Sequence, residues 1–455
     1  MDIAALLDRQ RSYFATGATL PVEKRLAALR RLKKEIQNRE SAIAEALQAD
    51  LGKAPFESYM TETGMVLDEL GYVEKHTPRW ARPKRVKTPF AQFPAKSFIL
   101  KEPYGVVLIM APWNYPFQLS LEPLIGALAA GNCAVIKPSA YAPRTSQLIA
   151  DLIAACFPPE YVAVVQGGRA ENQALLEQKF DYIFFTGGIE VGKLVMEKAA
   201  RHLTPVSLEL GGKSPCIIDE SADIPLAAKR LAFGKFLNAG QTCVAPDYVL
   251  VHQSVYDALV DALNMEIRAF FGTDPLACPE YPQIINQKHF ERLLGLLQGA
   301  DILAGGQHDG KGRIAPTLLG GISAESPCMQ EEIFGPLLPL LPYHRLEEAV
   351  EFVRSRPKPL ALYLFTRNQN TEKQVLSTLS FGGGCVNDTI IHLATSRMGF
   401  GGVGASGMGS YHGRYSFDTF THEKSMVKKS GKIDLPVRYH PYTDKNFRML
   451  KKFLK

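Results

Sequence analysis

The stretch GVVLIMAPWNYPF (105–117) decides the fold, because a continuous apolar run ends there in a turn bounded by prolines. Three further apolar runs follow it, each with a helical pattern behind it: CAVIKPS (133–139), VAVVQGG (162–168) and YIFFTGG (182–188). Continuous apolar runs, in contrast to alternating ones, fit parallel strands that are buried on both faces. Strands separated by helices predict a doubly wound α/β sheet, which binds ligands at the carboxyl ends of its strands.

A second α/β stretch is predicted from about residue 208 to residue 400. Its expected strands are SPCIID (214–219), YVLVH (248–252), ALYLFT (361–366) and GGCVND (383–388), with long helical patterns between them. The flanking segments differ in character. Residues 1–50 have helical periodicity, residues 78–96 are rich in proline and basic residues, and the tail from about residue 417 is basic and aromatic. We expect an extended connector at 78–96 and a packing arm at the C-terminal end.

Composition places the chain among ordinary soluble globular proteins. Of its 455 residues, 46% are hydrophobic and 22% are charged, and the net charge of +6 is spread without a dense basic stripe in the middle, which argues against nucleic-acid binding. No apolar run reaches the ~20 residues of a membrane helix, and the N-terminus lacks a signal layout, so a cytoplasmic protein is expected. The seven cysteines are widely spaced, with no CxxC and no Cys/His cluster, which argues against disulfides and a structural zinc site.

Three residues could carry the chemistry. Cys243 ends KFLNAGQTC, where small residues let the backbone turn sharply, so its thiolate could act as a nucleophile. Glu209, in SLELGGKSP, could act as a general base beside a double glycine. Asn114, in APWNYPF, could donate to a developing oxyanion. On local sequence alone, a buried structural cysteine and a turn-forming asparagine are the commoner interpretations, whereas a salt-bridged or solvated acid and a general base are about equally common.

Other motifs could hold a phosphate or a ribose. Lys137 and Ser139 lie at a strand end in IKPSA, and Gly187 and Gly192 lie in the strand-to-helix turn FTGGIEVGK. Glycine-rich approaches to helix N-termini bind phosphates through free N–H groups, although a plain βα turn explains the pattern equally well. QEEIFGP, with Glu332, also fits a polar helix end, and the glycine-rich segment 399–409 predicts a tight loop.

As an ordered set, these motifs resemble the aldehyde dehydrogenase superfamily. APWNYPF, IKPS, FTGG…VGK, LELGGKSP, GQTC, EEIFGP and FGGVGASGMGSYHG appear in the family's order, and the length and the C-terminal sequence look like the class 3 branch. The resemblance covers nearly the whole chain, least clearly residues 1–50. It implies a dinucleotide-binding domain at 1–80 and 103–208, a catalytic domain at 209–416, and a bridging or oligomerisation arm with a C-terminal tail at 81–102 and 417–455.

The resemblance also assigns roles. Cys243 matches the nucleophile, Glu209 the general base, and Asn114 the oxyanion donor together with the backbone N–H of Cys243. The cofactor set, for NAD or NADP, would be Lys137, Ser139, Trp113, Thr186, Gly187, Gly188, Gly192, Glu332 and Phe334, with no metal. The implied activity is oxidation of medium or long aliphatic, or aromatic, aldehydes to carboxylic acids. The implied assembly is a homodimer. Some class 3 relatives carry a hydrophobic C-terminal membrane anchor, and because this chain ends at Phe453-Leu454-Lys455 without one, a soluble enzyme is expected.

Two positions depart from the family pattern. Many relatives carry Glu after KPS, where this chain has Ala140, so NADP is expected to be accepted. Many have Ser where this chain has Gly188, which removes one side-chain contact at the helix start. Three alternatives are weighed: a coenzyme A-acylating dehydrogenase, which would lack Glu209; a cofactor-free thiol hydrolase, which would need a histidine partner; and a non-catalytic relative, which the intact Cys243, Glu209, Asn114 and Glu332 disfavour.

Overall fold

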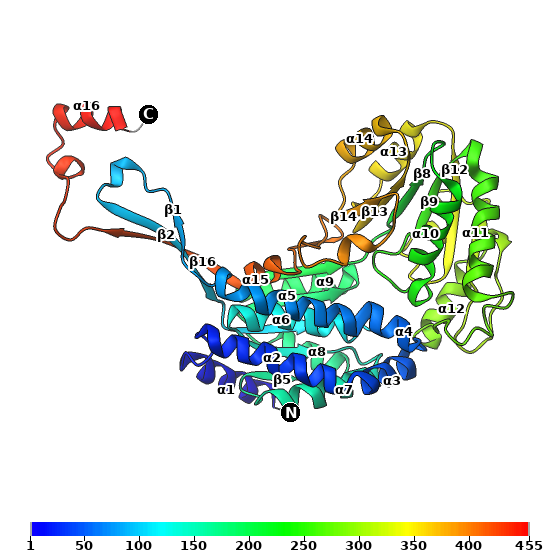
Figure 1. The fold of residues 1–455 in the computed structure, drawn as a ribbon, viewed down its shortest axis with the longest axis horizontal. Helices are drawn as coiled ribbons and strands as arrows, with labels where there is room; N and C mark the ends of the chain where they lie inside the picture. Colours follow the sequence, from blue (N-terminus) through cyan, green and yellow to red (C-terminus); the bar gives the residue numbers. More distant parts are fainter. Residues whose placement is uncertain (1, 454–455) are drawn as a thin grey trace.

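The fold is α/β, and a computed structural model describes residues 2–453 as three sheets with surrounding helices (Figure 1). The first sheet has six strands in the order β15-β7-β6-β3-β4-β5. Its strands are β3 (Val106–Met110), β4 (Cys133–Lys137), β5 (Val162–Val164), β6 (Tyr182–Gly187), β7 (Val206–Leu210) and the antiparallel β15 (Gly407–Met408).

The order of these strands reverses at β3. From β3 the chain adds β4 and β5 on one side, and then returns to add β6 and β7 on the other side, all in parallel. All residues of β3 and β4 are buried, as the continuous apolar runs predict. In an open α/β sheet, the crevice at such a reversal lies beyond the carboxyl ends of the two neighbouring strands. Here these are the ends of β3 and β6.

Helices cover both faces of this sheet. Helix α6 is buried along its whole length and packs against α2, α5 and α15. The elements of this region are α1 (Ile3–Ala15), α2 (Val22–Asn38), α3 (Glu40–Leu51), α4 (Pro55–Ser58), the π-helical turn η1 (Tyr59–Thr63), α5 (Gly64–Trp80), α6 (Gln118–Ala130), α7 (Pro143–Cys156), α8 (Arg169–Leu176), α9 (Ile189–Ala200) and α15 (Arg414–Thr419). The helical pattern expected over residues 1–50 is confirmed by α1, α2 and α3.

The second sheet has seven strands in the order β10-β11-β12-β9-β8-β13-β14, and only β10 is antiparallel to its neighbour. Its strands are β8 (Pro215–Ile218), β9 (Tyr248–His252), β10 (Asp301–Ala304), β11 (Thr317–Gly320), β12 (Leu337–Tyr343), β13 (Ala361–Phe365) and β14 (Gly383–Val386). Around it lie α10 (Ile224–Phe236), η3 (Leu237–Gly240), η4 (Gln253–Val255), α11 (Tyr256–Phe271), α12 (Gln287–Gly295), η5 (Pro327–Met329), α13 (Leu346–Arg354), α14 (Gln369–Thr378) and η6 (Ile391–Leu393).

A three-stranded antiparallel sheet forms an arm that projects away from the body of the molecule (Figure 1). It pairs β1 (Lys84–Val86) with β2 (Ala95–Pro103), and β2 with β16 (Thr421–Lys429). The remaining elements of the arm are η2 (Phe90–Gln92), η7 (Pro436–Arg438) and α16 (Asp444–Phe453), which lies at its far end. The segment 78–96 is therefore only partly an extended connector, because α5 continues to Trp80 and β1 and the start of β2 lie within it.

The domain boundaries stay a prediction. Each predicted domain contains most of the strands of one sheet. No helix within residues 2–453 has the length and apolar character needed to cross a membrane.

Candidate active site

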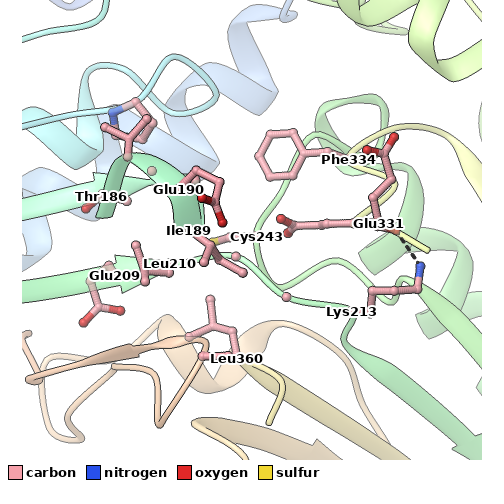
Figure 2. Close-up of a pocket in the computed structure, with 18 of the residues that line it drawn as sticks. Thr186, Ile189, Glu190, Glu209, Leu210, Lys213, Cys243, Glu331, Phe334 and Leu360 are labelled. Carbon is pink, nitrogen blue, oxygen red and sulfur yellow. Dashed lines mark hydrogen bonds between the residues drawn. The ribbon is translucent and has the colours of Figure 1, made fainter. Parts of the chain in front are cut away.

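A cleft of about 710 Å³ lies beyond the carboxyl ends of β3, β6 and β7 and faces the second sheet. Nine of the twelve predicted site residues line it: Trp113, Asn114, Thr186, Gly187, Gly188, Glu209, Cys243, Glu332 and Phe334. Figure 2 shows Cys243 near the middle of this group, with Glu209 on one side and Phe334 and Glu331 on the other. The other three, Lys137, Ser139 and Gly192, are outside its lining.

Cys243 follows a tight backbone turn. Asn238, Ala239 and Gly240 have φ angles of 51°, 50° and 75°, a left-handed run that residues other than glycine rarely adopt. The thiol is half-buried, and burial, with smaller effects of Glu332 and Glu209, raises its pKa to about 12. The backbone N–H groups of Cys243 and Val244 oppose this shift, because they donate to the sulfur and favour its anionic form.

Asn114 is held with one side-chain N–H free. The side chain is 2% exposed, and its Nδ2 donates to the carbonyl of Gln241 over 3.0 Å. An amide nitrogen has two N–H groups, so the bond to Gln241 fixes the plane of the amide and leaves the second N–H for another acceptor. Gln241 lies two residues before Cys243, which ties the amide directly to the nucleophile loop, residues 238–243, named for the predicted role of Cys243.

Glu209 lies inside β7, opposite Gly407 of β15. It is buried, and neither of its carboxylate oxygens has a hydrogen-bond partner among residues 2–453. Burial raises the pKa of this carboxyl well above its ordinary value. A buried carboxylate without donors is a strong proton acceptor, which suits a general base.

Glu332 lies in a loop that two cations hold in place. Lys213 Nζ pairs with Asp247 and donates to the carbonyl of Glu331 over 2.9 Å, the bond drawn in Figure 2. Arg292 donates to the carbonyl of Ile333 over 2.6 Å. Burial, with a smaller effect of Asp247, raises the pKa of Glu332 to about 8. The bonds from Lys213 and Arg292 thus fix the loop without using the carboxylate of Glu332. The QEEIFGP segment is a loop at Glu332, and not the polar helix end that its sequence also fitted.

Aromatic rings form one wall of the cleft. Phe334 has a φ of 51°, and its ring meets Trp113 edge-on with 5.3 Å between centroids. His289 packs on Trp113 with a centroid distance of 5.2 Å. A bulky residue in a left-handed conformation costs free energy and is found mainly at functional sites. The left-handed backbone of Phe334 thus places its ring in the lining of the cleft.

The first turn of α9 opens into the cleft. Its N-cap, Gly188, offers no side chain, and a Cβ added there would meet no atom within 4 Å. The backbone N–H groups of this turn are therefore accessible to an anion, as at phosphate-binding helix starts. Gly192 serves the packing of α9, because a Cβ there would lie 2.6 Å from Leu210 Cδ2.

Lys137 and Ser139 lie further along the sheet, at the end of β4. The ammonium of Lys137 donates to the carbonyls of Pro138 and Gly167 over 2.8 Å and 2.7 Å. The hydroxyl of Ser139 accepts from the backbone N–H of Tyr141 over 3.2 Å. Both side chains are thus engaged within the chain, and the structure does not bring them to the lining of the cleft.

A second, apolar pocket of about 200 Å³ meets the cleft at the thiol. Cys243, Leu119, Phe400 and Tyr411 line both cavities. Apart from these, the pocket is lined mainly by apolar side chains: Met60, Met65, Phe233, Leu237, Val244, Ile390, Ile391, Leu393 and Ala394. Cys243 therefore stands between the larger cleft and a smaller, apolar pocket.

Sequence reasoning missed several residues of the site. Lys213, Arg292, His289 and Tyr411 all line the cleft, and none of them is among the predicted site residues. Lys213 lies in LELGGKSP and Tyr411 lies in FGGVGASGMGSYHG, whereas Arg292 and His289 come from α12, where no local pattern marks them. Within residues 2–453, no group of three or more His, Cys, Asp or Glu side chains is arranged to hold a metal ion.

Comparison with known proteins agrees with this geometry. Residues 1–426 match the aldehyde dehydrogenase family model, and the chain belongs to that family. It is 51% identical to 4,4'-diaponeurosporen-aldehyde dehydrogenase of Staphylococcus aureus, over 98% of this chain and 97% of that protein. It is 45% identical to human aldehyde dehydrogenase family 3 member B1, over 98% of this chain and 96% of that protein. The relatives confirm the likeness to the class 3 branch.

Solved structures give the same result. A structure described as the substrate-bound state of Staphylococcus aureus AldH superposes with a TM-score of 0.98 at 50% identity, over 100% of both chains. An indole-3-acetaldehyde dehydrogenase complexed with NAD+ superposes with a TM-score of 0.85 at 27% identity, over 93% of this chain and 88% of the other. The protein is accordingly an aldehyde dehydrogenase enzyme with the α/β architecture of that family.

Gly211 provides a test of the Glu332 position. A Cβ at Gly211 would overlap Glu332 Oε2, whereas a Cβ at Gly212 would have no neighbour closer than 3.4 Å. If Glu332 holds a nucleotide ribose, Gly211→Ala should weaken cofactor binding by about tenfold to a hundredfold, the value of one charge-assisted hydrogen bond. Titration of tryptophan fluorescence would measure the Kd, since Trp113 lines the cleft.

Gly212→Ala is the matched control and should bind cofactor like the unaltered protein. Equal Kd values for the two variants would contradict a role for Glu332 in holding the ribose.

Proposed function

We propose that the protein oxidises medium or long aliphatic, or aromatic, aldehydes to carboxylic acids with NAD or NADP, through a thiohemiacetal and a thioester on Cys243. The observation that carries the proposal is the position of Cys243, which faces a cleft of nucleotide size on one side and an apolar pocket on the other. A thiol, a buried base and a free amide N–H line the same cleft. The family to which the chain belongs supports the reaction type.

Attack by the Cys243 thiolate on the aldehyde carbon turns the carbonyl oxygen into an oxyanion. The second N–H of Asn114 is the side-chain donor for this oxygen, since the first is held by Gln241. The backbone N–H of Cys243, which in the free protein favours the thiolate, is the second donor. A donor fixed before reaction is worth more than one that must turn, because no reorganisation is needed as charge develops.

Glu209 completes the turnover. A bound nicotinamide supplies the hydride acceptor that converts the thiohemiacetal into a thioester. Glu209 then takes a proton from the water that attacks the thioester, which frees Cys243 and releases the acid. Glu209 suits this role better than Glu332, because the carboxylate of Glu209 has no donor among the described residues, while the backbone N–H of Gly212 donates to Glu332.

The cleft fits a nicotinamide dinucleotide. The open first turn of α9, formed by residues 188–191, would hold the pyrophosphate. Glu332 would hold the nicotinamide ribose beside Phe334 and Trp113. Lys137 and Ser139, at the end of β4, would hold the adenosine ribose, and Lys137 would then exchange a carbonyl partner for the ribose. Thr186 and Gly187 would border the pyrophosphate.

The apolar pocket supports aldehydes with an apolar body. The relative from Staphylococcus aureus is named 4,4'-diaponeurosporen-aldehyde dehydrogenase. The human relative is named aldehyde dehydrogenase family 3 member B1. Hydrolysis is favoured over transfer to coenzyme A because Glu209 is present and its carboxylate has no hydrogen-bond partner within residues 2–453. We also expect a cytoplasmic homodimer in which the arm formed by β1, β2 and β16 bridges the subunits.

The reaction is tested by the rise of reduced-nicotinamide absorbance on a panel of aliphatic and aromatic aldehydes, without coenzyme A. Cys243→Ala should reduce the rate to background, because no thioester can form, while its thermal unfolding stays like that of the unaltered protein. Turnover only after coenzyme A is added would replace hydrolysis by acyl transfer. No turnover by folded protein under either condition would refute the proposal.

Glu209→Gln should separate the two half-reactions. Loss of the base should slow thioester hydrolysis by about a hundredfold to ten-thousandfold, while a burst of one reduced cofactor for each active site remains.

In the unaltered protein the carboxylate form of Glu209 disappears as the pH falls through a pKa that burial has raised. Steady-state rates should therefore decline at a higher pH than an ordinary glutamate allows. Stopped-flow absorbance across pH would show both effects; a variant with neither a burst nor a changed pH profile would contradict the assignment.

Ala140 tests the cofactor preference. Ala140 is exposed after Ser139, and without a carboxylate there the 2′-phosphate of NADP meets no repulsion. Ala140→Glu should raise the ratio of kcat/KM for NAD to that for NADP by about tenfold, measured by initial rates with both cofactors. Ala200→Glu, at the exposed end of α9, is the control and should leave the ratio unchanged. An unaltered protein that uses NAD alone would show that Ala140 does not decide the preference.

A further inference from the structure

A fully buried ion pair lies behind the oxyanion donor. Lys53 and Glu62 are both 0% exposed, and Lys53 Nζ lies 2.6 Å from Glu62 Oε1. Lys53 follows α3, and Glu62 lies in the π-helical turn η1, so neither belongs to the sheets that form the cleft. Neither residue is part of the motifs identified in the sequence.

Lys53 contacts the two residues at the end of the turn after β3. Its ammonium donates to the backbone carbonyl of Asn114 over 3.0 Å and lies 3.9 Å from the centroid of the Tyr115 ring. The hydroxyl of Tyr115 is in turn 2.6 Å from the hydroxyl of Thr242, the neighbour of Cys243. One buried cation thus contacts both Asn114 and a residue bonded to the nucleophile loop.

Glu62 holds the other end of the same segment. Its Oε2 accepts from the backbone N–H groups of Phe117 and Gln118 over 2.8 Å and 3.2 Å. Helix α6 starts at Gln118 and has no capping side chain from its own N-cap. A carboxylate satisfies these free donors and also complements the positive end of the helix dipole. The peptide from Asn114 to Gln118 is therefore fixed at both ends by one ion pair.

The Asn114 carbonyl has a second donor from the nucleophile loop. Asn238 Nδ2 donates to it over 2.8 Å, and to the carbonyl of Gln241 over 3.2 Å. The carbonyl is thus held between Lys53 on one side and Asn238 on the other. A shift of this carbonyl would move the side-chain N–H that the oxyanion needs, and a misplacement of about 1 Å costs on the order of a hundredfold in rate.

We propose that Lys53 and Glu62 are positioning residues, which set the Asn114 peptide so that its free N–H points to the oxyanion. This inference rests on the proposed function. A buried ion pair is a poor device for stability, because removing two charges from water costs about as much as their attraction returns. The ion pair contributes fixed geometry instead, because the hydrogen bonds of the ammonium and the carboxylate are directional. Apolar packing would not orient the backbone groups in this way.

The test is the double variant Lys53→Met/Glu62→Gln, which removes both charges of the ion pair together. It should lower kcat by about tenfold to a hundredfold, with the KM for aldehyde and the Kd for cofactor changed less than threefold. In an Asn114→Ala background the same double variant should cause no further fall in kcat, because the donor it positions is already absent. Initial rates and tryptophan fluorescence titration of the full-length protein measure these quantities.

Arg25→Met is the control for loss of a buried cation. Arg25 is also buried and also bonds to backbone carbonyls, those of Thr19, Leu20 and Ala129, away from the cleft. It should reduce the thermal stability and leave kcat unchanged. An unchanged kcat in Lys53→Met/Glu62→Gln, or an equal fall in kcat with and without Asn114, would overturn the proposal.

If the double variant does not fold, the single variant Glu62→Gln provides the test in its place. It keeps an acceptor for one N–H of the α6 start and should show a smaller fall in kcat with the same dependence on Asn114. A fall that is independent of Asn114 would again overturn the proposal. Failure of the proposed function would instead appear as an absence of turnover in the unaltered protein, so the two failures are distinguishable.

Discussion

The parallel pairing of β3 with both β4 and β6 is the interaction on which the site depends. Because β3 has a parallel neighbour on each side, the turns after β3 and β6 leave the sheet at the same edge and in opposite directions. One turn delivers Trp113 and Asn114, and the other delivers Gly188 and the open start of α9. The reversal of the strand order at β3 is thus what opens a cleft between the ends of β3 and β6.

Rigidity at the site comes from bonds between segments far apart in the chain. The left-handed run before Cys243 is not a conformation that its residues prefer, and Asn238, Gln241 and Asn114 bond to one another across it. Strain of this kind persists only where the surroundings fix each group more than once. The nucleophile loop satisfies that condition, since its carbonyls and amides are bonded both within the loop and to the turn after β3.

The sequence predicted the elements with strong local signals, and missed those that depend on tertiary context. The apolar runs located β3, β4, β6 and β9 closely, since buried parallel strands need such runs. Strand β12 was missed because Pro339 and Pro342 argue against an interior strand, although they pair there with Leu319 and Val251. Motifs located Cys243, Glu209 and Asn114. Lys53 and Glu62 have no local signal, because their meaning arises only when residues 53, 62, 114 and 238 converge.

The shared position of Cys243 between two cavities has a consequence for how such an enzyme diversifies. The walls of the apolar pocket come from η1, α10 and η6, whereas the cleft is walled by the strand ends and the start of α9. The two sets overlap only around the thiol. Residues such as Met60, Phe233 and Ile391 can therefore change in bulk while the wall of the cleft keeps its shape. Substitutions in the lining of the apolar pocket can thus alter the space beside Cys243, while the lining of the cleft stays unchanged.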